Sequence, residues 1–460
     1  MQRVDEEATL ETIESTLKSD PIGRNADVAR FIQILRLING PYSIFIDAPW
    51  GSGKTFFVKQ VAEVLKSANP YIDSSDGLVG EVLDNLLDSD CIADLEGTNS
   101  FLPIYFNAWE NDHYENPIMP LLATIAADAD STKRTDTIDA IKEAASMAID
   151  AALAIGGIPV STEKFISALS GKNFLDDFNK SIELRSRIDG LITSLLPETA
   201  NKAVLFIDEL DRCRPEFATK LLEQTKGLFQ QENVIVVYST DKIQLANALE
   251  GLYGSSYDRL KYLERFHDFE FALTPVAPIS YLEAKGVSVH SSYFFMKIAM
   301  AYIAERECPP RTCNRFVEKL NQGKAYIDSM RNNGSRGDWV ANLSKNALLP
   351  TFIAMAEFEP LKWDKVRAGA DFKFVFEFAK TNLKFIEYLD SSISEGRYGN
   401  ANSLTDSVRK NCVEDVCALI FLSDHSDKRF EDARKRAGSW WDFDTEICRS
   451  LIFPDVKQKN

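Results

Sequence analysis

The sequence has few residues of the kinds that hold metal ions or cross-link a chain. Its 460 residues include seven cysteines and four histidines, and no two cysteines have C-x-x-C spacing. The pairs Cys308/Cys313 and Cys412/Cys417 are five positions apart, which is too loose for a usual zinc finger or ribbon. The histidines lie far apart in the chain. We therefore expect no metal cluster among these residues, and we expect reduced thiols in a cytoplasmic protein.

Basic residues are also scarce relative to acidic ones. The chain has 52 Lys and Arg against 69 Asp and Glu, a formal net charge of −17. A protein that covers a long stretch of nucleic acid is usually basic, so this balance argues against a broad nucleic-acid footprint. It does not exclude a local basic groove.

Long apolar runs are missing as well. The best candidate for a membrane span, residues 144–160, falls short of the ~20 residues that a transmembrane helix needs, and Asp150 lies in its middle. Gly156, Gly157 and Pro159 end it. The acidic N-terminus is unlike a signal peptide. We expect a buried helix at 144–160 and no membrane span.

One stretch, residues 42–59, organises the rest of the chain. It reads YSIFIDAPWGSGKTFFVK. The apolar run 43–47 predicts a buried parallel strand, and the apolar residues from Phe56 onwards predict a helix. Between the two lies a glycine-rich turn.

Strand, glycine-rich turn and helix together favour a phosphate-binding loop. Glycines let the backbone turn tightly enough to present N–H groups to a phosphate, and the helix start adds the positive end of its dipole. Lys54 would supply a charge for the β- and γ-phosphates, and Thr55 a hydroxyl for Mg²⁺. The residues that we expect around the phosphates are Ala48, Pro49, Trp50, Gly51, Ser52, Gly53, Lys54, Thr55 and Phe56.

The match to the P-loop pattern G-x-x-x-x-G-K-S/T is imperfect. Position 48 is Ala where the pattern has Gly, and a near miss, Gly171-Lys172-Asn173, occurs elsewhere in the chain. A glycine-rich turn without a ligand is the alternative. The strand before the turn and the helix after it favour the P-loop.

A second stretch, AVLFIDELDR at 203–212, is an apolar run that ends in the acidic residues that a P-loop NTPase needs beside its P-loop. Five apolar residues end in Asp208 and Glu209. Asp208 would hold Mg²⁺ through water, and Glu209 would orient and deprotonate an attacking water. The alternative is a strand that ends in solvated carboxylates.

Five short runs of mainly apolar residues predict the strands of the core. They lie near 43–47, 102–106, 203–207, 234–238 and 269–273, with helical patterns between them. This alternation predicts a parallel α/β sheet with its ligand at the carboxyl ends of the strands. Thr240, just after the fourth run, would then lie beside the γ-phosphate. Trp109, after the second run, is either core or at this ligand-facing edge.

The remaining pattern is helical. A helix is expected at 28–38, with Asp27 as its N-cap. We divide the chain into an N-terminal helical segment (1–40), an α/β core (41–275) with a helical insertion at about 117–197, a helical lid (276–325) and a C-terminal helical domain (326–460).

Several separated stretches resemble one family, the KAP P-loop NTPases. They extend over about residues 18–322, and the Trp in the P-loop and the Asp-Arg-Cys after the acidic pair are fairly specific to it. The matching pieces are Asp20-Pro21, Ala48 to Thr55, Phe106 to Trp109, Ile207 to Cys213, Tyr262 to Phe266, Pro310-Arg311 and Arg315-Phe316.

The resemblance implies a P-loop core of the additional-strand type, similar to AAA+ and STAND proteins, that binds Mg²⁺ and ATP. Pro310-Arg311 and Arg315 look like the family's lid arginines. Arg311 would contact the γ-phosphate, with Arg315 behind it or on an acidic neighbour; the alternative for each is a surface arginine. Many members have membrane helices in the insertion, and this chain lacks a credible one there. That implies a soluble, prokaryotic member, of a kind often linked to defence against phage or plasmids beside an effector partner.

The function expected on these grounds is a cytoplasmic ATPase that switches a helical lid, acting with a protein effector or as a homo-oligomer. One rival is a nucleotide-gated scaffold with negligible turnover. Another is a nucleic-acid motor, which the acidity of the chain disfavours.

Overall fold

The computed structural model describes residues 7–72, 83, 86–87, 93–95, 99–130, 185–193, 196, 200–254, 258–330, 339–396, 398, 404–422 and 424–437. The helix expected at 144–160 and most of the expected insertion lie outside these residues. The chain divides into two compact units, Glu6–Thr274 and Pro275–Asn460 with the first five residues.

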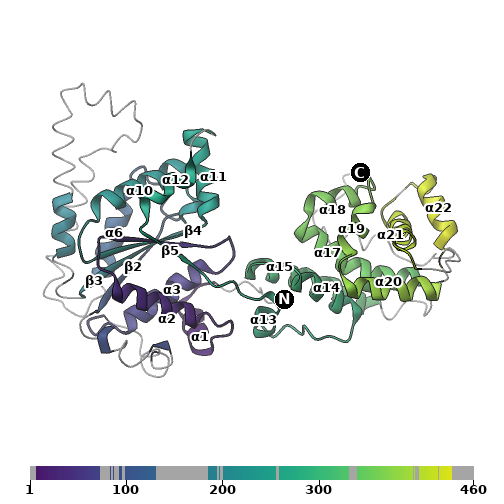
Figure 1. The fold of residues 1–460 in the computed structure, drawn as a ribbon, viewed down its shortest axis with the longest axis horizontal. Coiled ribbons are helices and arrows are strands. Elements are labelled where there is room, and N and C mark those ends of the chain that lie inside the picture. The colour runs from purple at the N-terminus through teal and green to yellow at the C-terminus, as the bar shows by residue number, and fades with distance from the viewer. Residues whose placement is uncertain are drawn as a thin grey trace. The chain divides into compact units, whose positions relative to one another are not determined.

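The first unit is built on a five-stranded parallel sheet (Figure 1). The strand order is β2-β3-β4-β1-β5, so β4 separates the P-loop strand β1 from the acidic strand β3. This is the additional-strand arrangement, and the predicted fold class is confirmed. The strands are β1 Tyr42–Asp47, β2 Phe101–Asn107, β3 Lys202–Asp208, β4 Val234–Thr240 and β5 Phe269–Ala272.

Helices cover both faces of the sheet. Figure 1 shows α1, α2 and α3 on one face and α6, α10 and α11 on the other. The helices of this unit with described bounds are α1 Leu10–Ser19, α2 Asn25–Leu37, α3 Lys54–Ser67, α6 Ile118–Asp130, α10 Pro215–Leu228, α11 Lys242–Tyr253 and α12 Arg259–Leu263.

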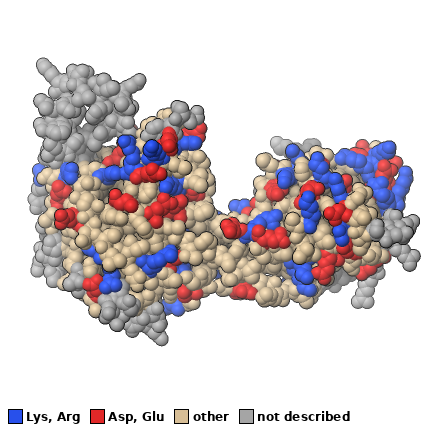
Figure 2. All heavy atoms as spheres, in the orientation of Figure 1, with Lys and Arg blue, Asp and Glu red and all other residues tan. Residues whose placement is uncertain are grey.

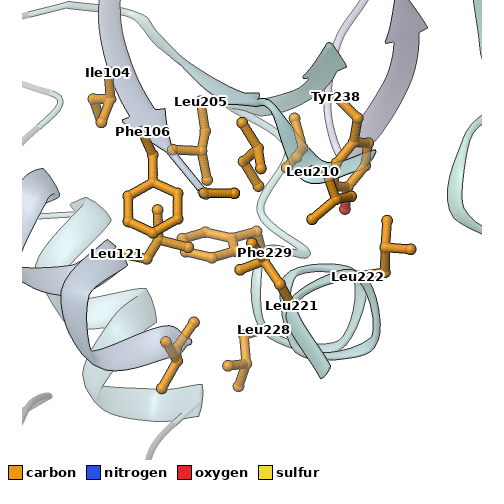
Figure 3. Close-up of a cluster of buried hydrophobic side chains, with 14 of the residues drawn as sticks. Ile104, Phe106, Leu121, Leu205, Leu210, Leu221, Leu222, Leu228, Phe229 and Tyr238 are labelled. Atoms are coloured by element: carbon orange, nitrogen blue, oxygen red, sulfur yellow. The ribbon is translucent and has the colours of Figure 1, made fainter. Parts of the chain in front are cut away.

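Alternate residues of each strand supply the two cores. Ile44 and Ile46 pack toward α2 and α3, whereas Phe45 packs on the opposite face with Phe106 and Leu205. Figure 3 shows part of this second core, where α10 meets the sheet. Because both faces are covered, the central strands β3 and β4 are buried along their whole length and are mostly apolar, so the sequence shows them as strands. The edge strand β5 contains Glu270 and is mostly exposed.

The expected N-cap of α2 is wrong. The helix begins at Asn25, and its Asn25 N–H donates to the Asp20 carboxylate at 3.1 Å. Asp27 lies inside the first turn, where its carboxylate accepts hydrogen bonds from outside the helix. A carboxylate already engaged with side chains and a distant strand end is not available to cap its own helix.

The described residues of the second unit are helical, with no strand among them. No described helix in the chain combines the length and the apolar character that crossing a membrane requires. On the face drawn in Figure 2, acidic and basic side chains are interspersed, and basic ones are densest over α22. The elements are α13 Pro278–Ala284, α14 Phe294–Ala304, α15 Pro310–Met330, α16 Trp339–Leu343, a π-helical turn Ser344–Leu348, α17 Leu349–Phe358, α18 Pro360–Arg367, α19 Lys373–Ala379, α20 Leu383–Gly396, α21 Asp406–Phe421 and α22 Lys428–Ala437.

Candidate functional site

The loop between β1 and α3 depends on two glycines for its backbone conformation. Gly51 and Gly53 have φ of 80° and 93°, in the left-handed region that side chains with a Cβ disfavour. A Cβ added at Gly53 would meet no atom within 4 Å, so glycine is needed there for the backbone angle and not for space. The turn delivers the chain into α3, which begins at Lys54. Its free N–H groups and helix dipole suit an anion.

Lys54 is folded onto this loop. Its side chain is buried, and its ammonium donates to the carbonyl oxygens of Ala48 and, at 3.3 Å, of Pro49. Burial lowers the pKa of Lys54, against the opposing effect of nearby carboxylates, of which Asp211 is the strongest. In the described part of the chain no carboxylate forms an ion pair with this ammonium. Phosphate oxygens could therefore replace two neutral acceptors without breaking a salt bridge.

The acidic pair lies at the same edge of the sheet. Asp208 is 1% exposed and accepts from the Tyr105 hydroxyl at 3.0 Å and from the Glu209 N–H at 2.9 Å. Each carboxylate oxygen accepts one of these bonds, which leaves lone pairs for the water molecules of a bound ion. Burial raises the pKa of Tyr105, so its hydroxyl keeps its proton and remains a donor.

Glu209 has a strained backbone and a restrained side chain. Its φ of 61° is left-handed, which is uncommon for a residue with a Cβ. One carboxylate oxygen lies 2.8 Å from the Arg212 guanidinium, and the other accepts from the Asn107 amide at 3.4 Å. Burial raises the pKa of Glu209, and Arg212 opposes that shift. A carboxylate with a raised pKa is a stronger proton acceptor, which suits a general base.

A third group of contacts ties the loop to the ends of β3 and β4. The Trp50 indole N–H donates to the Asp211 carboxylate, and the Thr240 hydroxyl donates to the other Asp211 oxygen at 3.2 Å. Asp211 is buried, whereas Trp50 is 49% exposed. The predicted γ-phosphate neighbour Thr240 is therefore linked to the P-loop through Asp211.

Strand register explains why these residues gather. Asp47 is level with Thr240, Asp208 with Ser239, and Asn107 with Asp208. Since neighbouring parallel strands end together, their last residues and the loops that follow form one edge. Most of the predicted site residues of the core therefore lie at one place, and Thr55 follows Lys54 in the first turn of α3.

Two side chains at this edge, Tyr105 and Asn107 from β2, were not predicted as site residues. Arg212, in the turn after Glu209, pairs with Glu209 of its own chain. Asn107 ends an apolar run, the same signal that drew attention to Asp208 and Thr240, so the sequence could have indicated it. Trp109 is 52% exposed, and the Arg212 guanidinium lies 5.5 Å from its ring centroid. The interpretation of Trp109 as a core residue is therefore wrong.

The two predicted lid arginines lie in the second unit, in the first turns of α15. Arg311 is exposed. Arg315 pairs with Glu357 at 2.7 Å, one of the two placements expected for it, and Lys319 pairs with the same carboxylate at 2.8 Å. Glu357 lies on α17 and its side chain is 2% exposed, so these pairs join α15 to α17.

No group of three His, Cys, Asp or Glu side chains gathers as a metal site among the described residues. A Mg²⁺ ion that is bound together with a nucleotide usually takes only one or two ligands from the protein and the rest from phosphates and water, so a site of this kind needs no such group.

Comparison with known proteins agrees with this geometry. No curated protein sequence matches the chain. The profile of the KAP family P-loop domain matches residues 25–283, more than half of the chain. The match spans all five strands, the glycine-rich loop and the acidic pair. The chain belongs to the KAP family and carries its P-loop domain.

Proposed function

We propose that this protein is a Mg²⁺-dependent ATPase that uses nucleotide binding and hydrolysis to switch its helical second unit. The observation that carries the proposal is the shared sheet edge. The glycine-rich loop between β1 and α3, with the buried Lys54, lies there beside the buried Asp208 and beside Glu209, a carboxylate of raised pKa. Membership of the KAP P-loop family supports nucleotide binding at this place.

Each residue has a definite role in this proposal. Lys54 would exchange its carbonyl acceptors for β- and γ-phosphate oxygens. Thr55 and Asp208 would hold Mg²⁺, which when bound neutralises charge on the phosphate oxygens. Glu209 would orient a water molecule and take its proton. Thr240, linked to the loop through Asp211, would respond to the γ-phosphate, and Arg311 would contact it from the lid.

Glu209 is restrained in its orientation. Its two oxygens contact Arg212 and Asn107, and these contacts oppose any turn of the carboxylate toward an attacking water molecule. The structure therefore describes a site that is assembled with its base restrained. This same observation favours a second candidate, a nucleotide-gated scaffold that binds ATP, turns it over negligibly and acts through a partner.

Phosphate release under steady-state conditions tests the proposal and separates the two candidates. An ATPase should release phosphate from Mg²⁺-ATP, and Glu209→Gln should slow it at least ~10²-fold, the usual contribution of a general base. A scaffold should bind ATP in calorimetry and release almost no phosphate with either form. Failure of the wild-type protein to bind ATP would end both candidates.

The cellular role proposed here rests on resemblance. We propose a cytoplasmic prokaryotic protein that acts in defence against phage or other mobile elements, with a protein effector or a second copy of itself as partner. A phage-challenge assay with the wild-type gene and Lys54→Ala tests this: protection should depend on Lys54, and equal plaque counts with and without the gene would contradict it.

A further inference from the structure

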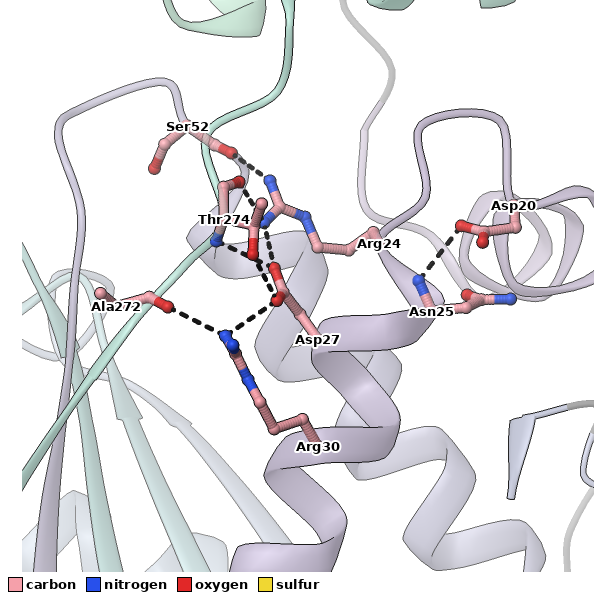
Figure 4. Close-up of polar contacts among 8 residues, drawn as sticks. All are labelled: Asp20, Arg24, Asn25, Asp27, Arg30, Ser52, Ala272 and Thr274. Atoms are coloured by element: carbon pink, nitrogen blue, oxygen red, sulfur yellow. Dashed lines mark hydrogen bonds and ion pairs between the residues drawn. The ribbon is translucent and has the colours of Figure 1, made fainter. Parts of the chain in front are cut away.

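Arg24 is a buried charged residue to which the roles above assign nothing. It is 6% exposed and precedes α2. Its guanidinium donates to three separate segments: to the Asp27 carboxylate at 2.8 Å, to the Thr274 carbonyl at 3.0 Å and to the Ser52 carbonyl at 3.3 Å (Figure 4). Ser52 belongs to the phosphate-type loop, and Thr274 is the last residue of the first unit. One planar group therefore connects the loop to the point where the chain leaves the core.

Asp27 completes the connection. Its carboxylate, 4% exposed, accepts from the Thr274 N–H at 3.0 Å and from the Thr274 hydroxyl at 2.7 Å. It also pairs with Arg30 at 3.0 Å, and Arg30 reaches the Ala272 carbonyl at 3.4 Å (Figure 4). Thr274 is thus held through its N–H, its carbonyl and its hydroxyl, an unusually complete set of contacts for a residue that ends a unit.

The bond to Ser52 also sets the direction of the next N–H group. In a trans peptide the carbonyl and the following N–H point in opposite directions. Since the Ser52 carbonyl points at Arg24, the N–H of Gly53 points away from Arg24, so that it could donate to a phosphate held by the loop. A phosphate that accepts this N–H polarises the peptide and strengthens the bond between the Ser52 carbonyl and Arg24.

We propose that Arg24 is a positioning residue that aims the Gly53 N–H at the phosphates of the nucleotide and passes their presence on to Thr274, where the chain continues into the second unit. The inference rests on the nucleotide binding proposed above. An arginine suits this role because its rigid fork presents several donors at once, whereas the single ammonium of a lysine cannot reach Ser52 and Thr274 together while paired with Asp27.

Three variants separate the steps. Arg24→Lys keeps the positive charge beside Asp27 and removes the forked guanidinium group that reaches Ser52 and Thr274. Thr274→Val removes the hydroxyl bond to Asp27 and leaves the contact to Ser52 untouched. Arg30→Gln is the matched control, because Arg30 pairs with the same carboxylate but is 53% exposed at its side chain and contacts no loop residue.

The readouts are calorimetry and hydrogen exchange with Mg²⁺ and adenosine 5′-(β,γ-imido)triphosphate, a probe that is not hydrolysed. In the wild type the probe should slow exchange about tenfold both at 48–57 and at 273–284, the effect of one charge-assisted hydrogen bond. Arg24→Lys should weaken binding about tenfold and, at saturation, protect only 48–57. Thr274→Val should bind like the wild type but show weaker protection at 273–284, because one of the two bonds by which Asp27 holds Thr274 is lost. Arg30→Gln should retain both.

Several outcomes would overturn the inference. One is an Arg24→Lys protein that still protects 273–284 as the wild type does. Another is loss of that protection in Arg30→Gln. The protection would then depend on how the charge of Asp27 is balanced and not on the contact of Arg24 with Ser52. If Arg24→Lys does not fold, as circular dichroism would show, Thr274→Val decides, and unchanged protection of 273–284 in it refutes the transmission. A wild type with no protection at 48–57 refutes the proposed function itself, and the inference with it.

Discussion

Arg212 restrains the proposed base, and its removal should therefore speed the reaction. Its guanidinium lies 2.8 Å from one Glu209 oxygen and over the Trp109 ring. Arg212→Ala leaves Glu209 with only the longer contact to Asn107. The carboxylate would then turn more easily toward a water molecule, and basal hydrolysis should rise.

The size of the effect follows from the exposure of the pair. Glu209 is 12% exposed at its side chain and Arg212 is 31% exposed, so solvent screens part of the attraction. Exposed ion pairs contribute up to about 1 kcal/mol, and this pair belongs near that limit. Releasing Glu209 from it should raise turnover roughly fivefold. Loss of the positive charge also raises the pKa of Glu209 further.

The direction in which the pH profile of the reaction shifts is an independent test of this restraint. A general base works as the carboxylate, so the rate falls as the pH drops through its pKa. Because removal of Arg212 raises that pKa, the acid limb of the kcat profile should move to higher pH.

The assay is phosphate release at saturating Mg²⁺-ATP over a range of pH, with Arg214→Ala as the control. Arg214 lies two positions further on, is 57% exposed at its side chain and pairs with Asp112, not with Glu209. It should leave turnover and the profile unchanged. A fall in turnover in Arg212→Ala with an unmoved acid limb would refute the restraint and point instead to an arginine that touches the phosphates.

Three further predictions concern the loop and the lid. Lys54→Ala should abolish detectable ATP binding in calorimetry, because the loop loses its only described charge for the β- and γ-phosphates; wild-type affinity would contradict the P-loop assignment. Gly53→Ala should cost about 1–2 kcal/mol in denaturant unfolding, because alanine resists a φ of 93° and has no new contact to compensate; an unchanged midpoint would mean that the loop relaxes. Arg311→Ala should lower turnover and weaken the preference for ATP over ADP, and equal competition curves for the mutant and the wild type would make Arg311 a surface arginine.

The central strands could be predicted from the sequence because burial on both faces leaves a nearly continuous apolar run in each of them. The runs expected near 43–47 and 203–207 are the strands Tyr42–Asp47 and Lys202–Asp208. Most of the predicted core site residues follow from the same rule, since each lies at or just after the carboxyl end of a strand.

The contacts among those residues could not be predicted in this way. The bond from Trp50 to Asp211 spans 161 positions, and the one from Arg24 to Thr274 spans 250. Such pairs depend on the register of neighbouring strands and on side-chain rotamers, which leave no local pattern. Asp27 shows the consequence: its sequence context indicates a helix cap, but its tertiary partners at Thr274 take up the carboxylate.

Two of these distant contacts bracket the loop and suggest why binding alone could already be a signal. Trp50 joins one side of the loop to Asp211 and so to Thr240 at the end of β4. Arg24 joins the Ser52 carbonyl to the exit of the chain after β5. The loop strand β1 lies between β4 and β5 in the sheet, so any shift that a triphosphate imposes on the loop acts on both neighbours at once. Hydrolysis, gated at Glu209 by Arg212, would then end the signal and not create it.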